Sequence, residues 1–238
     1  MAADCDIIQL KAGALTPTDV FGARAKTLAD LIAADFNTTD AWAISVDRVR
    51  SIARSVFPPD WPFADRLKGG ELFSLRSSPV MRAWGGPETL LNIGMTAAVR
   101  DKLAKTLGLE AANALYCRFV QDYAVQVMRL DEEEFEEVLA SVTDDTPDHA
   151  KMLAASLEYY ESEMDEPFPQ DPIEQLQNAA RSMASAWTGT SARILREAKG
   201  ADQDAGLGLI AQQMVLGLGR GESGAGVGQF VSPATGAV

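Results

Sequence analysis

Short apolar runs, some of them alternating with polar positions, mark the first 95 residues. Three of these runs predict strands, over residues 7–10, 41–46 and 71–76. A helix is expected over 22–35, where Leu28, Leu31 and Ile32 fall on one stripe. This part of the chain therefore mixes short strands with helix.

Helical periodicity takes over between about residues 96 and 187. Within 110–129 large apolar residues recur every four positions, which predicts a buried stripe; they are Leu115, Phe119, Tyr123 and Val127. Further helices are expected over 131–142 and after Pro147. The clearest helix start is Asp171-Pro172-Ile173-Glu174, because Asp171 can accept from the first free N–H groups, Pro172 lacks an N–H, and Glu174 can complete a capping box.

The last 51 residues, 188–238, have a different composition. Ten of the 19 glycines lie between Gly200 and Gly236. Residues 207–215 predict a strand, and 224–231 predict its antiparallel partner across a glycine-rich turn. The whole pattern indicates an α+β fold.

The net charge is concentrated in one segment. The chain carries 21 Lys and Arg against 34 Asp and Glu, and residues 131–166 alone hold 14 acids and one base, which accounts for 1 − 14 = −13. The rest of the chain is neutral, which argues against a nucleic-acid partner because such a partner needs a basic face. The acidic segment is interpreted as a solvated helical face or as a docking surface for a basic partner.

The sequence shows neither a recognisable targeting signal nor a metal-binding motif. No window approaches the roughly 18 apolar residues of a membrane span, and the acidic N-terminus lacks the positive charge of a secretory signal. Cys5 and Cys117 form no CxxC pair, which is typical of reduced thiols, so we expect a cytoplasmic protein without membrane contact. His149 is the single histidine, and we expect it at the surface, with neither a metal nor a catalytic role.

Two features offer candidate chemistry. The turn 219–226 is rich in glycine, so its backbone N–H groups could approach phosphate oxygens, although a plain hairpin turn has the same composition. Arg76 ends a predicted strand, where a guanidinium can hold phosphate bidentately or simply form a surface salt bridge.

Several segments, in the same order, resemble the N-terminal nucleotide-binding domain of pyruvate phosphate dikinase, an ATP-grasp relative shared with phosphoenolpyruvate synthase. Ser74-Leu-Arg-Ser-Ser78 is similar to the family's Ser-Val-Arg-Ser-Gly, and Glu88-Thr-Leu-Leu-Asn-Ile-Gly94 to its Asp-Thr-x-Leu-Asn-Leu-Gly. The other similar segments are Gly22–Leu31, Tyr116–Tyr123, Phe168–Trp187, Gln212–Val215, Ser223–Val227 and Ser232–Gly236.

The resemblance implies a fold and a ligand. The fold is an ATP-grasp-type lobe with a mixed sheet, made of residues 1–95 and 188–238, that carries a helical subdomain at 96–187. The ligand is an adenine nucleotide, ATP or AMP. By position in the motifs, the resemblance assigns the phosphates to Arg24 and Arg76, the covering loop to Gly85, the adenine to Gln212, Met214 and Val215, and a second glycine turn to Gly224 and Gly226.

Departures from the family pattern shape the functional expectation. Arg24 stands where the family has lysine, and Ala83-Trp-Gly-Gly-Pro-Glu88 replaces its Met-Pro-Gly-Met-Met-Asp loop. In the family, the carboxylates that bind Mg²⁺ follow the point where the match ends, as does the phosphohistidine domain. We therefore expect no magnesium ligands and no catalytic residues in this chain, and nucleotide binding that is weak and does not complete phosphoryl transfer.

Two other functions fit the same residues. The chain could be a non-catalytic interaction or regulatory module that binds a protein partner, or a second copy of itself, through its acidic helices or an exposed sheet edge. Alternatively, it could be one subunit of a phosphotransferase whose second lobe comes from another polypeptide.

Overall fold

The computed structural model describes residues 6–143, 147–202, 204–218 and 222–226. The strands are β1 (Ile7–Gln9), β2 (Ala41–Ile44), β3 (Phe73–Pro79), β4 (Leu90–Ile93) and β5 (Leu207–Gln213). The α-helices are α1 (Thr18–Ala33), α2 (Val46–Ala53), α3 (Ala64–Lys68), α4 (Ala97–Leu107), α5 (Leu109–Tyr123), α6 (Glu132–Ser141), α7 (His149–Met164), α8 (Pro172–Thr188) and α9 (Thr190–Glu197). A 3₁₀ turn, η1 (Arg82–Trp84), and a π-helical turn, η2 (Ala124–Met128), complete the description.

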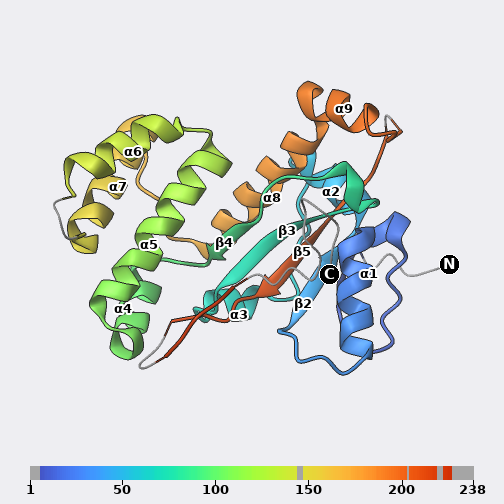
Figure 1. The fold of residues 1–238 in the computed structure, drawn as a ribbon, viewed down its shortest axis with the longest axis horizontal. Coiled ribbons are helices and arrows are strands. Elements are labelled where there is room, and N and C mark those ends of the chain that lie inside the picture. Colours follow the sequence, from blue (N-terminus) through green and yellow to red (C-terminus); the bar gives the residue numbers. More distant parts are fainter. Residues whose placement is uncertain (1–5, 144–146, 203, 219–221, 227–238) are drawn as a thin grey trace, which may run out of the picture.

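The five strands form one sheet in the order β1-β2-β5-β3-β4 (Figure 1). Every described pair is antiparallel, so the expectation of a mixed sheet is wrong. The prediction that a strand at 207–215 pairs with a strand at 224–231 is also wrong. Both edges of β5 are already paired, one with β2 and the other with β3. Of the second segment only 224–226 lies within the described residues, and these form no strand.

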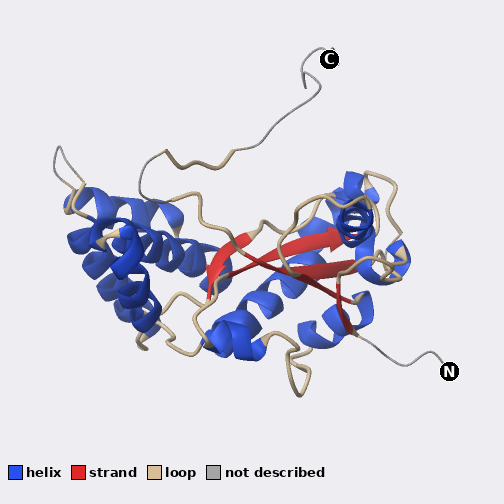
Figure 2. Ribbon diagram, turned by 90° about the horizontal axis from the view of Figure 1, so that it is seen from below, coloured by secondary structure: helices blue, strands red, loops and turns tan. Residues whose placement is uncertain are grey.

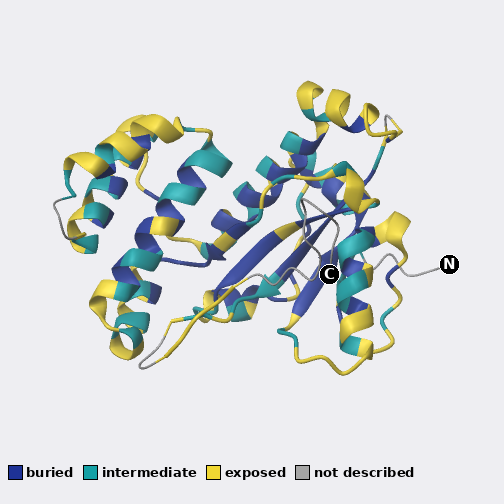
Figure 3. Ribbon diagram, in the orientation of Figure 1, coloured by how far each residue is buried: buried dark blue, intermediate teal, exposed yellow. Residues whose placement is uncertain are grey.

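Helices cover both faces of the sheet because successive strand residues point to opposite sides. Along β2, Ala41 and Ala43 pack with Phe21 and Ala25 of α1 in one apolar cluster. Trp42 and Ile44 point the other way, into a larger cluster that includes residues of α2, α3 and α8. Most residues of β2 to β5 are accordingly buried, whereas the edge strand β1 is partly exposed and most of α9 is exposed (Figure 3).

Helices α4 to α7 lie beside one end of the sheet (Figures 1 and 2). Within this group α5 packs against α4 and α7, and α6 against α7. Helix α8, which falls in the range predicted as a helical subdomain, packs mainly against α2 and also contacts β3, β4 and β5. The larger apolar cluster therefore runs without interruption from the sheet into the helices.

The helix starts follow from the side chains that precede them. Asp131, Asp148 and Asp171 each accept hydrogen bonds from backbone N–H groups in the first turn of α6, α7 and α8. The helix start predicted at Asp171 is thus confirmed, with Pro172 at its first position. In the part of the chain that is described, no helix combines the length and apolar character needed to cross a bilayer.

Candidate functional site

Helix α1 is interrupted near its start by Gly22, whose backbone has φ 81° and ψ 165°. A Cβ at this position would lie 1.7 Å from the carbonyl oxygen of Ser78, at the end of β3. The Ser78 hydroxyl donates to the Phe21 carbonyl at 2.8 Å and accepts from the Ala25 N–H at 3.1 Å. The regular part of α1 therefore starts directly against the end of β3, with its first turn beside this strand.

Arg24 of α1 lies within electrostatic range of two other guanidinium groups, those of Arg76 of β3 and Arg82 of η1, and the three are here called the arginine cluster. Arg24 Nη1 donates to the Ser77 carbonyl at 3.0 Å. Burial lowers the pKa of Arg24, and the neighbouring charges of Arg76 and Arg82 lower it further. Within the described ranges no carboxylate forms an ion pair with any of the three.

Gln212 joins the arginine cluster to the middle of the sheet. Its Oε1 accepts from Arg76 Nη1 at 3.1 Å, and its Nε2 donates to the Thr39 hydroxyl at 3.1 Å. Gln212 lies opposite Ser74 in the β3–β5 register. The alternative interpretation of Arg76 as a surface salt bridge therefore finds no support among the described residues, since its partner is a neutral amide.

The loop after β3 brings Gly85 close to a further cation, Lys199, which follows α9. Gly85 has φ 75°, and the Lys199 ammonium lies 4.0 Å from where its Cβ would be. At the next residue, Gly86, a Cβ would lie 2.7 Å from the Ser77 hydroxyl. The loop thus packs closely on the end of β3 because two consecutive residues lack side chains.

The other predicted binding residues lie further along the chain from β5. The Met214 N–H donates to the Leu72 carbonyl at 2.9 Å, and its sulfur lies 3.0 Å from the Asn92 nitrogen of β4. Val215 is 74% exposed. Gly224 and Gly226 lie in an exposed stretch where a Cβ would meet nothing within 4 Å. None of the described contacts brings these four residues to the arginine cluster.

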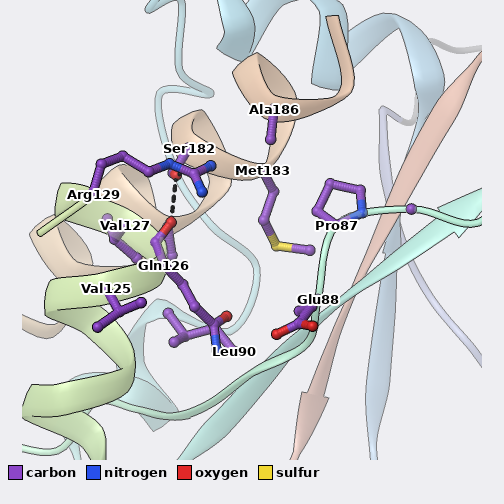
Figure 4. Close-up of a pocket in the computed structure, with 12 residues that line it drawn as sticks. Pro87, Glu88, Leu90, Val125, Gln126, Val127, Arg129, Ser182, Met183 and Ala186 are labelled. Atoms are coloured by element: carbon purple, nitrogen blue, oxygen red, sulfur yellow. Dashed lines mark hydrogen bonds between the residues drawn. The ribbon is translucent and has the colours of Figure 1, made fainter. Parts of the chain in front are cut away.

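A separate cavity of about 350 Å³ lies between the loop at 86–90, η2 and α8 (Figure 4). Leu90, Val125 and Met183 give it apolar walls, and Arg129 donates to the Ser182 hydroxyl at 3.2 Å. No predicted binding residue lines it. The cavity is therefore distinct from the arginine cluster.

Arg82 of the arginine cluster and Lys199 beside Gly85 were not among the binding residues predicted from the sequence. Both lie in segments of irregular spacing, and neither falls on a residue that the family motifs use. Arg82 lies directly before the Ala83–Glu88 segment, where a single basic residue says little, and Lys199 lies in no matched segment.

Groups suited to metal binding are absent from the described ranges, since no three His, Cys, Asp or Glu side chains gather there. His149 is the first residue of α7, and its Nδ1 contacts the Glu110 carboxylate. The expectation that this chain supplies no magnesium ligands stays a prediction.

A helix start, three guanidinium groups without a described carboxylate partner and a glycine loop lie at one strand end, and these are features that suit the binding of an anion such as phosphate. The comparisons with known proteins agree with this class. The chain is 31% identical over 177 residues to the pyruvate, phosphate dikinase of Clostridium symbiosum, 32% over 180 residues to that of Rhizobium meliloti, and 31% over 175 residues to the chloroplastic pyruvate, phosphate dikinase 1 of Oryza sativa.

Each of these matches covers 69% of this chain, and the chain spans about a fifth of the length of these relatives. No protein-family model matches. The resemblance to pyruvate, phosphate dikinases that the motifs indicate is therefore confirmed, and the chain is related to one segment of these enzymes.

Proposed function

We propose that this chain is a dikinase-like domain that binds an adenine nucleotide on the α1 side of the sheet. The phosphates would contact Arg24, Arg76 and Arg82 beside the start of α1, and Gly85 would cover them. The base would lie along Gln212, Met214 and Val215, with Gly224 and Gly226 as a second glycine turn. The ATP-grasp character of the lobe and the cytoplasmic location belong to the same proposal.

One observation carries the proposal: three guanidinium groups cluster without a described carboxylate partner. Bringing like charges together and burying one of them costs free energy, which an anionic ligand would offset. Nucleotide phosphates suit the cluster because guanidinium groups present paired N–H donors to phosphate oxygens. The relationship to enzymes named dikinases points to the same ligand class.

We further propose that binding is weak and that the domain alone does not complete phosphoryl transfer. Such transfer depends on positioning and on metal ions that neutralise developing charge. The described residues contain no group of three His, Cys, Asp or Glu side chains that could hold such a metal ion.

Isothermal titration with ATP, ADP and AMP, each with and without Mg²⁺, tests nucleotide binding. We expect Arg76→Gln to weaken ATP binding by about tenfold or more, because a charge-assisted contact to phosphate contributes about 1.5–3 kcal/mol. Arg54→Gln is the matched control, since Arg54 is an exposed arginine at the C-terminal cap of α2. No heat with millimolar nucleotide, or equal losses in both variants, would contradict the proposal.

The acidic helices favour a second candidate function, which is the binding of a basic protein partner. The first turn of α6 carries Glu132, Glu133 and Glu134, all exposed. If this surface is the functional one, replacing the three glutamates with glutamine should abolish capture of a basic partner and leave ATP binding unchanged. Size-exclusion chromatography of the same variant also tests whether two copies associate through this surface.

A third candidate, one subunit of a split phosphotransferase, makes a different prediction for the isolated chain. It requires ATP turnover to appear only when a second polypeptide is added. Turnover by the purified chain with Mg²⁺, lost in Arg76→Gln, would instead overturn the proposal that transfer is incomplete.

A further inference from the structure

The cavity between the loop at 86–90, η2 and α8 is lined by one anionic and one cationic residue, Glu88 and Arg129. Both residues are exposed, so a ligand can reach them. In the ranges that the structure describes, neither forms an ion pair. Figure 4 shows Arg129 on the η2 side of the cavity and Glu88 on the opposite side, next to Pro87. Two opposite charges are therefore available at the two ends of one cavity.

The space between these charges has mainly apolar walls. The half-buried apolar residues that line it are Pro87, Val125, Val127 and Ala186. Met183 of α8 lies between the two sides (Figure 4). The volume of about 350 Å³ is near the lower end of the roughly 300–1,000 Å³ of small-molecule sites, which combine apolar walls with a few polar groups that orient the ligand. A ligand that matches this cavity has an apolar body with a charge at each end.

The backbone is irregular where η2 lines the cavity. Ala124–Met128 form a π-helical turn, and Arg129 follows it with φ 66° and ψ 30°. Left-handed backbone at a helix end usually falls on glycine or asparagine, so an arginine in this conformation carries strain. Both π-helical turns and strained residues are frequent at functional sites. This observation is independent of the charges and concerns the same wall of the cavity.

Ser182 of α8 holds Arg129 beside the cavity. Its hydroxyl donates to the Gln126 carbonyl at 2.9 Å and accepts from Arg129 Nη2 at 3.2 Å. Among the described residues this is the single hydrogen bond of the Arg129 side chain. A guanidinium group has five N–H donors, so most of them are available to a carboxylate of a ligand.

We propose that this cavity binds a small linear zwitterion, whose carboxylate contacts Arg129 and whose ammonium group contacts Glu88, with an apolar chain between the two. Aliphatic ω-amino acids and short apolar peptides share this chemistry. No residue of the arginine cluster lines the cavity, so this binding does not depend on the nucleotide site proposed above.

Isothermal titration of the full chain at constant ionic strength tests the proposal. The zwitterionic probes are ω-amino acids with chains of four, six and eight carbons and, as the peptide, leucyl-leucine. Hexanoate and hexylamine each carry only one of the two charges. We expect the best zwitterion to bind at least about tenfold more tightly than either of these, because it forms a second charge-assisted contact.

The best-binding zwitterion identifies which of the two sources the cavity takes. The absence of saturable binding of every zwitterion up to about 20 mM would overturn the proposal. Equal affinities for the zwitterion and for both single-charge probes would overturn it as well, because the two charges would then make no contact.

Variants assign each contact to its residue. Arg129→Gln should reduce the affinity for the best zwitterion to that for hexylamine, and Glu88→Gln should reduce it to that for hexanoate. Arg181→Gln is the matched control, since Arg181 is an exposed arginine of α8 that donates to Asn178 and does not line the cavity. Arg76→Gln should also bind the zwitterion as wild type does.

An unchanged affinity in both cavity variants, or an equal loss in the Arg181 control, would contradict the proposed contacts. If a variant does not fold, the series of probes on the wild-type chain decides the matter.

Discussion

Gly22 is the residue that allows α1 to start against the end of β3. Its φ of 81° and ψ of 165° are accessible essentially to glycine alone, and a Cβ would overlap the Ser78 carbonyl. We expect Gly22→Ala to lower the free energy of unfolding by at least about 3 kcal/mol, from backbone strain and overpacking together. Urea denaturation followed by circular dichroism measures this loss.

Gly108 provides a matched control for that substitution. It has φ 90° and ψ 155° between α4 and α5, but nothing lies within 4 Å of its would-be Cβ. Gly108→Ala should therefore cost only the backbone strain, about 1–2 kcal/mol. Equal losses in the two variants would mean that the contact with Ser78 does not decide the position of α1.

At the scale of elements, Gln175 attaches α8 to the end of β4. The side chain is fully buried, accepts from the Gly94 N–H at 2.9 Å, and donates to the Met95 and Pro169 carbonyls at 2.9 and 2.8 Å. Gln175→Leu would leave these three backbone groups unpaired, so we expect a loss of about 3–5 kcal/mol in the free energy of unfolding. Gln177→Leu is the control on the same helix; Gln177 is half-buried and has no described side-chain hydrogen bond, so a similar loss there would refute the explanation.

Elements with a strong local pattern could be predicted from the sequence, whereas their pairing could not. The alternation at 41–46 and the cap at Asp171 are local signals, and β2 and α8 lie where these signals predict them. Strand direction depends on which segments meet in space, so the sheet was wrongly expected to be mixed, and β5 was given a partner that β2 and β3 exclude. Strand β4 was missed because Leu90–Ile93 was considered only as part of a family motif.

The candidate site shows the same division between local and spatial information. The motifs supplied Arg24, Arg76 and Gln212, and the structure brings these three together. The motifs could not supply Arg82 and Lys199, because proximity to the site depends on the path of the loop after β3 and on where α9 ends. The assignments of Met214, Val215, Gly224 and Gly226 to a nucleotide stay predictions.

For the whole molecule, the question is whether the sheet and the helices at its end unfold together. The sequence predicts two parts, 1–95 with 188–238, and 96–187. The large apolar cluster nevertheless runs across the join and contains side chains of both parts, and Phe168 belongs to the helical part. Its ring centre lies 5.1–6.0 Å from those of Tyr116, Phe119, Tyr123 and Tyr160.

A continuous core predicts one cooperative transition. Tryptophan fluorescence reports mainly on the sheet side, where Trp42 and Trp61 are buried, and circular dichroism at 222 nm reports on all the helices. Phe168→Ala should lower the free energy of unfolding by about 3–5 kcal/mol and shift both urea midpoints by the same amount, whereas Phe36→Ala, at a side chain 62% exposed, should shift neither. If only the circular dichroism midpoint moves, the helices form a separate folding unit and the apolar contacts across the join are too weak to couple it to the sheet.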